Sequence, residues 1–262
     1  MKVKIMTDTN SGISVAEGRD LGIEVLPMPV IVGGKVRTEG VDIDQETLYQ
    51  ALENDVPVST SQPAPAQITD MWDRILAEGA ESLVFIPMSS GLSGSCATAR
   101  QLALKYNGRV QVADNHRISV TQRSSVLDAL ALAQQDISAE EIRERLEKSG
   151  YDASIYICVD TLKHLKHSGR ITAAGASLAT AMGLHPILNI RGGKLDAQCV
   201  CRGDKHTQKQ LIKLMETDLE KRFKYIEPDN LSLCTAGTFV RREDAEAWTD
   251  RVSKAFPRHR VA

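Results

Sequence analysis

The sequence predicts an α/β fold of two domains: an N-terminal, mainly parallel sheet flanked by helices, and a C-terminal α+β domain. Short apolar runs alternate with segments of helical spacing through residue 150, which is typical of a parallel sheet. After residue 150, two runs of β-forming residues flank the pair Gly192-Gly193, a pattern that favours an antiparallel hairpin. The chain of 262 residues is long enough for two modest domains, and we expect them at residues 1–149 and 150–262.

The elements of the N-terminal half follow from apolar spacing and capping residues. Residues 3–6 predict a first strand, and Asp8 at its end either belongs to a site or caps the next helix. Gly33-Gly34 predicts a hairpin, and Asp44 predicts a helix start. The remaining strands are expected at residues 23–32, 35–37, 82–86 and 109–114, and the helices at residues 45–52, 68–77, 96–104, 119–135 and 138–148.

The C-terminal half predicts a different arrangement. Strands are expected at residues 154–159, 186–190, 194–201 and 231–235, and helices at residues 162–167, 173–182, 207–223 and 242–255. Ser168-Gly169-Arg170-Ile171 forms a basic turn between two of these helices. Helices that accompany antiparallel strands in this way are typical of an α+β domain.

The loop expected between the strand at 82–86 and the next helix is the first candidate site. It carries four serines and two glycines, in the run Ser89-Ser90-Gly91-Leu92-Ser93-Gly94-Ser95. Small residues allow a ligand to approach the backbone, and the start of a helix favours an anion. No lysine follows the glycines, which argues against a Walker A phosphate loop. The loop therefore predicts a site for a small, singly charged anion, or else an ordinary serine-capped helix.

A second candidate lies in the proline-containing segment at residues 57–65. Proline fixes φ and disfavours helix at the residue before it, so this segment can hold Thr60 and Ser61 at fixed positions. The alternative is a plain connecting loop. In an open parallel sheet, ligands bind at the carboxyl ends of the strands, where we expect the Ser89 loop and Asp114 to lie.

Composition excludes several classes of function. The formal charge is −2 and aromatic residues make up 4% of the chain, which argues against nucleic-acid and anionic-membrane partners. No run of 18 apolar residues occurs, so we expect neither a membrane span nor a signal peptide. The five cysteines are odd in number and scattered, which favours a reduced, cytoplasmic protein with buried thiols.

Metal-binding patterns are equally absent from the sequence. Cys199 and Cys201 share one face of a strand but lack a second pair at zinc-site spacing. His164 and His167 are three residues apart, which favours a solvated helix face over a metal site. We expect neither a metal nor a cofactor.

Five stretches occur together in the order and spacing of the DegV family, which the chain resembles over nearly its whole length. The combination of Thr60-Ser61-Gln62-Pro63, the loop at 89–95 and Ser168-Gly169-Arg170-Ile171 is far more specific than any one of them. The other two stretches are Met6-Thr7-Asp8-Thr9-Asn10-Ser11 and His185-Pro186-Ile187-Leu188.

The resemblance implies a fatty-acid-binding protein that is not itself an enzyme and encloses a long acyl tail in an apolar tunnel. Characterised bacterial members present the bound acid to a dihydroxyacetone-kinase-like fatty acid kinase, which phosphorylates the carboxylate to an acyl phosphate. Carried over to this chain, the hydroxyls of Thr60 and Ser93 bind the carboxylate, and the amide of Gly94 is a further donor. Arg202 matches a basic position near the head group, and Arg170 matches a residue linked to kinase docking.

Two departures from the family pattern stand out. Members usually continue into a strand with a His-x-Gly-x-Gly-like motif whose histidine assists at the head group, and His259 does not match it. The segment after Asp114 is usually rich in glycine, whereas here it holds residues 117–125. The bulky Arg123 in that segment predicts a narrower pocket or an altered preference for chain length.

Two other functions stay open. One is a small-molecule hydrolase that uses Ser89, Ser90 or Ser93, although the loop lacks a Gly-x-Ser-x-Gly elbow. The other is a lipid-sensing module without a transfer function. The sequence offers neither a nucleophile–base pair nor paired carboxylates, so it favours a lipid carrier.

Overall fold

The computed structural model describes residues 2–178, 184–239 and 241–262. Contacts within the chain divide it into two compact units. The first unit comprises residues 1–153 and 191–194, and the second comprises residues 154–190 and 195–262.

The first unit is built on a parallel four-stranded sheet of order β2-β1-β6-β7. Its strands are short and apolar because they are covered on both faces. The strands are β1 (Val3–Asp8), β2 (Glu24–Leu26), β6 (Ser82–Ile86) and β7 (Val110–Val112).

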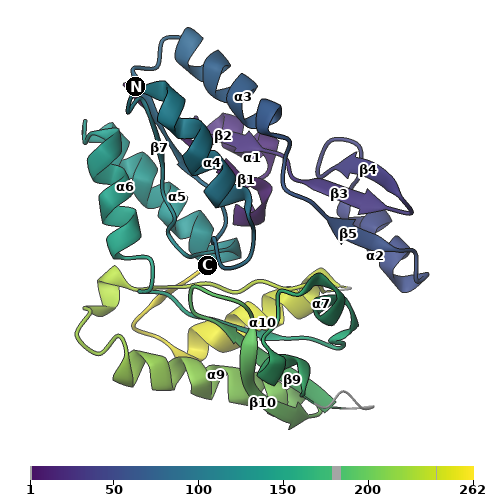
Figure 1. Ribbon diagram of the computed structural model, residues 1–262. Coiled ribbons are helices and arrows are strands. Elements are labelled where there is room, and N and C mark those ends of the chain that lie inside the picture. The colour runs from purple at the N-terminus through teal and green to yellow at the C-terminus, as the bar shows by residue number, and fades with distance from the viewer. Residues whose placement is uncertain (1, 179–183, 240) are drawn as a thin grey trace. The chain divides into compact units, whose positions relative to one another are not determined.

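Helices flank this sheet (Figure 1). Alternate residues of its strands pack against different helices. Ile5 and Val84 face the core formed with α5 (Ser119–Gln134) and α6 (Ala139–Lys148). Met6 and Phe85 face the core formed with the two helices on the other side, α3 (Pro65–Ala77) and α4 (Ser95–Ala103). The predicted α/β class, with a parallel sheet between layers of helices, is confirmed. The remaining short helices are α1 (Val15–Leu21), η1 (Thr9–Ser11) and η2 (Leu104–Tyr106).

A small antiparallel sheet of order β4-β3-β5 interrupts this alternation. The hairpin predicted at Gly33-Gly34 is present, and Asp44 caps α2 by accepting a hydrogen bond from the Thr47 N–H at 2.8 Å. The segment at 57–65 contains a strand that the sequence did not predict, because Ser59 pairs with Ile31 across a long separation in the chain. The bounds are β3 (Pro29–Val32), β4 (Lys35–Thr38), α2 (Gln45–Glu53) and β5 (Val58–Thr60).

The second unit contains an antiparallel sheet of order β10-β9-β8 and a short parallel pair, β11-β12. The hairpin expected around Gly192-Gly193 is present as β9 and β10. The strands are β8 (Ile155–Cys158), β9 (Leu184–Ile190), β10 (Asp196–Arg202), β11 (Ser232–Leu233) and β12 (Arg260–Val261).

The helices of the second unit differ from the prediction at several ends. The helix expected at 173–182 is the short α8, and residues 179–183 lie outside the described residues. The helix expected at 207–223 begins earlier, at Asp204. The strand expected at 231–235 is shorter, and the sequence did not predict its partner β12. The helices are α7 (Lys163–Ser168), α8 (Ala173–Ala176), α9 (Asp204–Lys221), η3 (Pro228–Asn230) and α10 (Arg242–Ala255).

Candidate ligand-binding site

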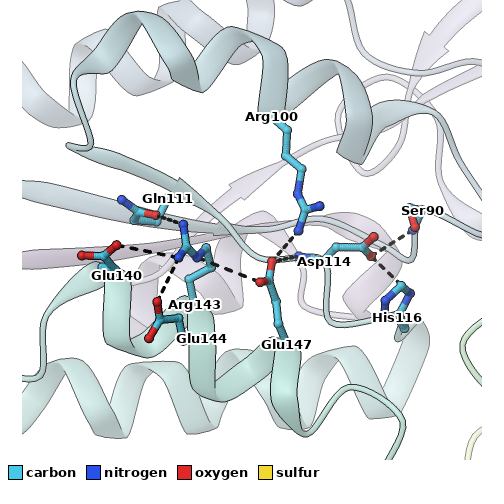
Figure 2. Close-up of polar contacts among 9 residues, drawn as sticks. All are labelled: Ser90, Arg100, Gln111, Asp114, His116, Glu140, Arg143, Glu144 and Glu147. Atoms are coloured by element: carbon cyan, nitrogen blue, oxygen red, sulfur yellow. Dashed lines mark hydrogen bonds and ion pairs between the residues drawn. The ribbon is translucent and has the colours of Figure 1, made fainter.

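The loop between β6 and α4 lies at the carboxyl edge of the parallel sheet, where two carboxylates from neighbouring strands hold its backbone. The N–H of Met88 donates to Asp8 Oδ2 at 3.0 Å, and Asp8 is the last residue of β1. The N–H of Ser90 donates to Asp114 Oδ1 at 3.2 Å, and Asp114 follows β7 (Figure 2). The Ser89 loop and Asp114 therefore lie at the expected edge of the sheet. We call residues 87–94 the head loop.

Asp8 caps a short helix, which is one of the two alternatives that the sequence left open, and it also contacts the head loop. Its carboxylate caps η1 by accepting the N–H of Asn10 at 3.1 Å, and it also holds the head loop. The side chain is almost fully buried, which raises its pKa above the ordinary value, and hydrogen bonds from Met88, Gln122 and Asn10 offset part of this effect.

The middle of the head loop packs against the turn at residues 191–194, which belongs to the same unit. The hydroxyl of Ser89 donates to the carbonyl of Gly192 at 2.8 Å and accepts the N–H of Gly91 at 3.1 Å. A Cβ on Gly91 would lie 2.8 Å from the Gly193 Cα, so only glycine fits there. Because the buried Ser89 gives its one proton to a carbonyl, it is not placed as the nucleophile of a hydrolase.

The end of the head loop forms the start of α4. Gly94 is the N-cap residue and is exposed, and the half-buried Ser93 accepts the N–H of Ser95 at 3.2 Å. An accepting hydroxyl keeps its own proton, which leaves the Ser93 O–H able to donate to a ligand. Among the residues described, Ser95 Oγ is buried without a hydrogen-bond partner. The N–H groups of a first helical turn lack carbonyl partners and favour an anion.

The segment that carries Thr60 lies beside this first helical turn. Thr60 is exposed at the end of β5, opposite Val30. Two residues further on, Gln62 Oε1 accepts a hydrogen bond from the Thr98 hydroxyl at 3.1 Å. The same oxygen lies close to Gly94: a Cβ added to that glycine would be 3.4 Å from it. The structure therefore brings the segments of Thr60, Ser93 and Gly94 together within one unit.

In the second unit, Arg202 is the one charged residue on an otherwise apolar sheet face. Strand register places Arg202 opposite Leu184, Val200 opposite Pro186, and Ile157 opposite Leu188, and paired residues share a face. Ile157 and Val200 are 37% and 36% exposed. We call this the apolar face; its members are Ile155, Ile157, Leu184, Pro186, Leu188, Ile190, Ala197, Val200 and Arg202.

The opposite face of the same sheet packs against α9. Tyr156 donates its hydroxyl to Asp218 Oδ2 at 2.9 Å, and His185 Nε2 lies 3.2 Å from Asp204 Oδ1. Cys158, Cys199 and Cys201 share this face, and burial raises the pKa of Cys158 to about 11. Burial likewise raises the pKa of Cys199 to about 11, so the thiols of Cys158 and Cys199 are protonated near neutral pH.

Arg170 lies in the turn that follows α7. Gly169 ends α7 in the left-handed conformation with φ of 66°, and Ile171 forms a bridge to Leu195. The half-buried Arg170 accepts the N–H of Leu195 through its carbonyl at 2.9 Å. Lys163, His164, Lys166 and His167 of α7 are exposed, so the turn follows a basic helix.

The segment after Asp114 supports the head loop through a backbone carbonyl, and charged side chains hold that segment in place. The N–H of Ser89 donates to the Arg117 carbonyl at 2.9 Å, and the Arg117 guanidinium donates to the Ser149 carbonyl at 2.6 Å. Burial lowers the pKa of Arg117. Glu147 accepts the N–H of Asp114 at 3.2 Å and also binds Arg100 of α4 (Figure 2).

Arg123 of α5 forms an ion pair with a residue of α1. Its guanidinium donates to both carboxylate oxygens of Glu17, one of them at 3.0 Å. This ion pair lowers the pKa of Glu17. The ion pair joins α5 to α1, and the effect of Arg123 on pocket width or on the preference for chain length stays a prediction.

Sequence reasoning missed three residues that shape the head loop. The sequence places Gln62 in a motif and Gly192 in a turn, but it does not reveal the contacts of either. Gln122 was not singled out, although its fully buried amide contacts Asp8 and Ile86. The residues around Gln122, from Thr121 to Ser125, are all polar, so no apolar period in the sequence marks Gln122 as an inward-facing residue.

The described residues contain no group of three or more side chains placed to hold a metal ion. Every helix in the described part of the chain is too short or too polar to cross a lipid bilayer.

Comparisons with solved structures show the class of fold. The structure "Fatty Acid Binding of a DegV family Protein from Thermus thermophilus" aligns with a TM-score of 0.81 at 26% identity, over 96% of this chain and 88% of that one. A stearic acid-binding protein from Eubacterium ventriosum aligns with a TM-score of 0.84 at 20% identity, over 98% and 89% of the two chains. The latter likeness concerns the fold alone.

Sequence comparison gives the family. A DegV domain-containing protein of Deinococcus radiodurans is 32% identical over 206 residues, which cover 78% of this chain and 73% of the relative. The model of the DegV family of uncharacterised proteins matches residues 2–261. The chain belongs to the DegV family.

Proposed function

We propose that this protein binds a long-chain fatty acid. The observation that carries the proposal is the apolar face, which has Arg202 at one end and partly exposed Ile157 and Val200 along it. A ligand with a long hydrocarbon tail and one negative charge matches that pattern. The Thermus thermophilus relative, whose structure is described as binding a fatty acid, supports the same ligand class.

Features of the first unit match the carboxylate of such a ligand. The hydroxyls of Thr60 and Ser93 and the amide of Gly94 are the donors that the family resemblance assigns to the head group. Charge-assisted hydrogen bonds of this kind are short and strong, and they fix orientation. Burial of the tail contributes about 0.8 kcal/mol per CH₂ before the costs of binding, so the tail supplies most of the affinity.

The proposed activity also includes a partner. The carboxylate is presented to a dihydroxyacetone-kinase-like fatty acid kinase, which converts it to an acyl phosphate, and Arg170 contributes to docking that kinase. The exposed basic residues of α7 beside Arg170 support an interaction with an acidic surface. The protein itself is a carrier rather than an enzyme, and its five free thiols fit a cytoplasmic location.

Ligand identity is tested by native mass spectrometry of the protein purified from bacteria, which should show a co-purifying long-chain acid. The double variant Thr60→Val with Ser93→Ala should then weaken palmitic acid binding roughly 100-fold or more, because each hydrogen bond to a charged group is worth about 1.5–3 kcal/mol. Unchanged affinity would contradict the assignment of these hydroxyls. Turnover of p-nitrophenyl butyrate that is lost in Ser90→Ala would favour the hydrolase instead.

The kinase partnership is tested with Arg170→Ala. We expect this variant to bind palmitic acid normally and to be phosphorylated poorly when the kinase is added. Arg242→Ala, an exposed arginine of α10 paired with Glu246, is the matched control and should behave like the wild type in both assays. Loss of acid binding in Arg170→Ala would place Arg170 in the lipid site rather than in the docking surface.

A further inference from the structure

Two polar side chains are buried beneath the head loop without any direct part in the proposed ligand contacts. Asp8 is 1% exposed and Gln122 is 0% exposed. A buried carboxylate costs free energy unless it is well bonded, so a position that lacks a function usually holds an apolar residue. Their presence here calls for a reason beyond packing.

The contacts of Gln122 show what the pair holds together. Its Nε2 lies 3.1 Å from each of three acceptors, namely Thr7 Oγ1, Asp8 Oδ1 and the carbonyl of Ile86. One amide from α5 therefore joins the last residues of β1 to the last residue of β6. The hydroxyl of Thr7 strengthens the same junction by donating to the Ile86 carbonyl at 2.8 Å.

The head loop begins at this junction. Ile86 is the residue before the loop, and the N–H of Met88 donates to the second carboxylate oxygen of Asp8. The carbonyl of Ile86 and the N–H of Met88, which lie on either side of Pro87, are thereby bonded to Gln122 and Asp8 respectively. Only four residues lie between Met88 and Ser93, so the pair fixes where the loop starts and limits where its donors can lie.

We propose that Asp8 and Gln122 are positioning residues that set the head loop for carboxylate recognition. This inference rests on the proposed fatty-acid function and adds a determinant of its head-group selectivity. The pair acts through the loop backbone and not through contact with the ligand. It therefore governs the preference for a carboxylate over an uncharged head group, and not the affinity for the tail.

The test compares palmitic acid with hexadecan-1-ol, which has a tail of the same length and no carboxylate. An equimolar mixture is added to the protein, and native mass spectrometry gives the ratio of acid-bound to alcohol-bound protein. This ratio does not depend on the fraction of protein that is folded. Asp8→Asn places an amide N–H₂ among the donors of Asn10 and Gln122, and we expect the ratio to fall about tenfold, the equivalent of one lost hydrogen bond.

A second variant and a control complete the experiment. Gln122→Met keeps the size of the side chain and removes the amide, so it tests the proposal even where Asp8→Asn does not fold, and the same fall is expected. Asp218→Asn changes a buried carboxylate that holds Tyr156 in the second unit, and it should lower stability while keeping the wild-type ratio.

The outcomes separate this inference from the proposed function. A wild-type protein that binds neither ligand, or both equally, would overturn the fatty-acid proposal itself. If the wild type prefers the acid, and Asp8→Asn or Gln122→Met folds and keeps that preference, the positioning role alone would be overturned. A fall in the ratio in Asp218→Asn as large as in Asp8→Asn would also overturn it, since any loss of stability would then have the same effect.

Discussion

Gln62 Oε1 accepts the hydroxyl of Thr98 at 3.1 Å and thereby joins the segment after β5 to the first turn of α4. The same oxygen lies beside Gly94, the cap residue of that helix. A neutral amide at this place leaves the helix start free of negative charge. The contact thus links the two motifs, at 60–63 and 89–95, that the sequence indicated as a site.

Gln62→Glu should reduce carboxylate binding without disturbing the fold. A glutamate can still accept the Thr98 hydroxyl, but it places a negative charge beside Gly94 and repels an anionic head group. We expect affinity for palmitic acid to fall about tenfold or more and affinity for hexadecan-1-ol to stay unchanged. Gln67→Glu makes the same change of charge on the exposed surface of α3 and serves as the control. Equal losses for acid and alcohol would contradict the placement of the anion near Gly94.

Gly91→Ala should destabilise the head loop. The added methyl group would lie 2.8 Å from the Gly193 Cα and 2.9 Å from the Gly192 carbonyl oxygen, and backbone atoms cannot move aside as a side chain can. We expect the free energy of unfolding to fall by about 1–3 kcal/mol in urea titrations. Gly193→Ala, whose Cβ meets nothing within 4 Å, changes the other partner of the same contact and should cost much less. Similar losses in the two variants would argue against a close approach at Gly91.

Val200→Asp tests the apolar face directly. A carboxylate in the middle of this face would be desolvated by a bound hydrocarbon tail, so binding of both palmitic acid and hexadecan-1-ol should be lost. Val36→Asp is the control, because Val36 is also an exposed valine on an edge strand, at 67% exposure. Normal binding by Val200→Asp would show that the tail lies elsewhere.

The buried Asp8 predicts a particular pH dependence of stability. Its pKa in the folded protein is raised mainly by burial, so the folded state holds the proton more tightly than the unfolded state. Its contribution to stability is therefore largest below the ordinary aspartate pKa and is lost as the pH rises through the raised value. The difference in unfolding free energy between wild type and Asp8→Asn, measured in urea at a series of pH values, should decrease over that window. An increase with pH would mean that the hydrogen bonds from Met88, Gln122 and Asn10 lower the pKa of Asp8 by more than burial raises it.

Local signals in the sequence predicted the elements whose cause is local. The start of α2 at Asp44 and the hairpin at Gly33-Gly34 each depend on a capping or turn residue and the spacing beside it, and both are present. Strand β5 was missed because prolines surround it and its partner β3 lies far away in the chain. Strand β12 was missed for a similar reason, since two residues carry no period and form a strand only by pairing with β11.

The candidate site divides in the same way. The loop at 89–95 was indicated as a site because small and hydroxyl residues gather in it, and its edge of the sheet followed from the alternation of strands and helices. The assignment of Ser93 and Gly94 to the carboxylate came from the family resemblance and stays a prediction. The sequence did not predict the side chains that support this loop, because the contact of Gln122 with Asp8 joins residues 114 positions apart. The ion pair of Arg123 with Glu17 did not follow from the sequence either, because 106 residues separate the two and no local pattern pairs them.

A single residue decides the chemistry of the β8–β9–β10 sheet. The register of β10 shifts between Ala197 and Cys199, where Gln198 is the extra residue and its side chain is held by Asn189 at 3.1 Å. If Gln198 paired with Ile187 in a regular ladder, Cys199 and Cys201 would lie opposite Pro186 and Leu184, in place of Val200 and Arg202. The cationic end of the proposed binding surface therefore depends on this bulge as well as on the arginine.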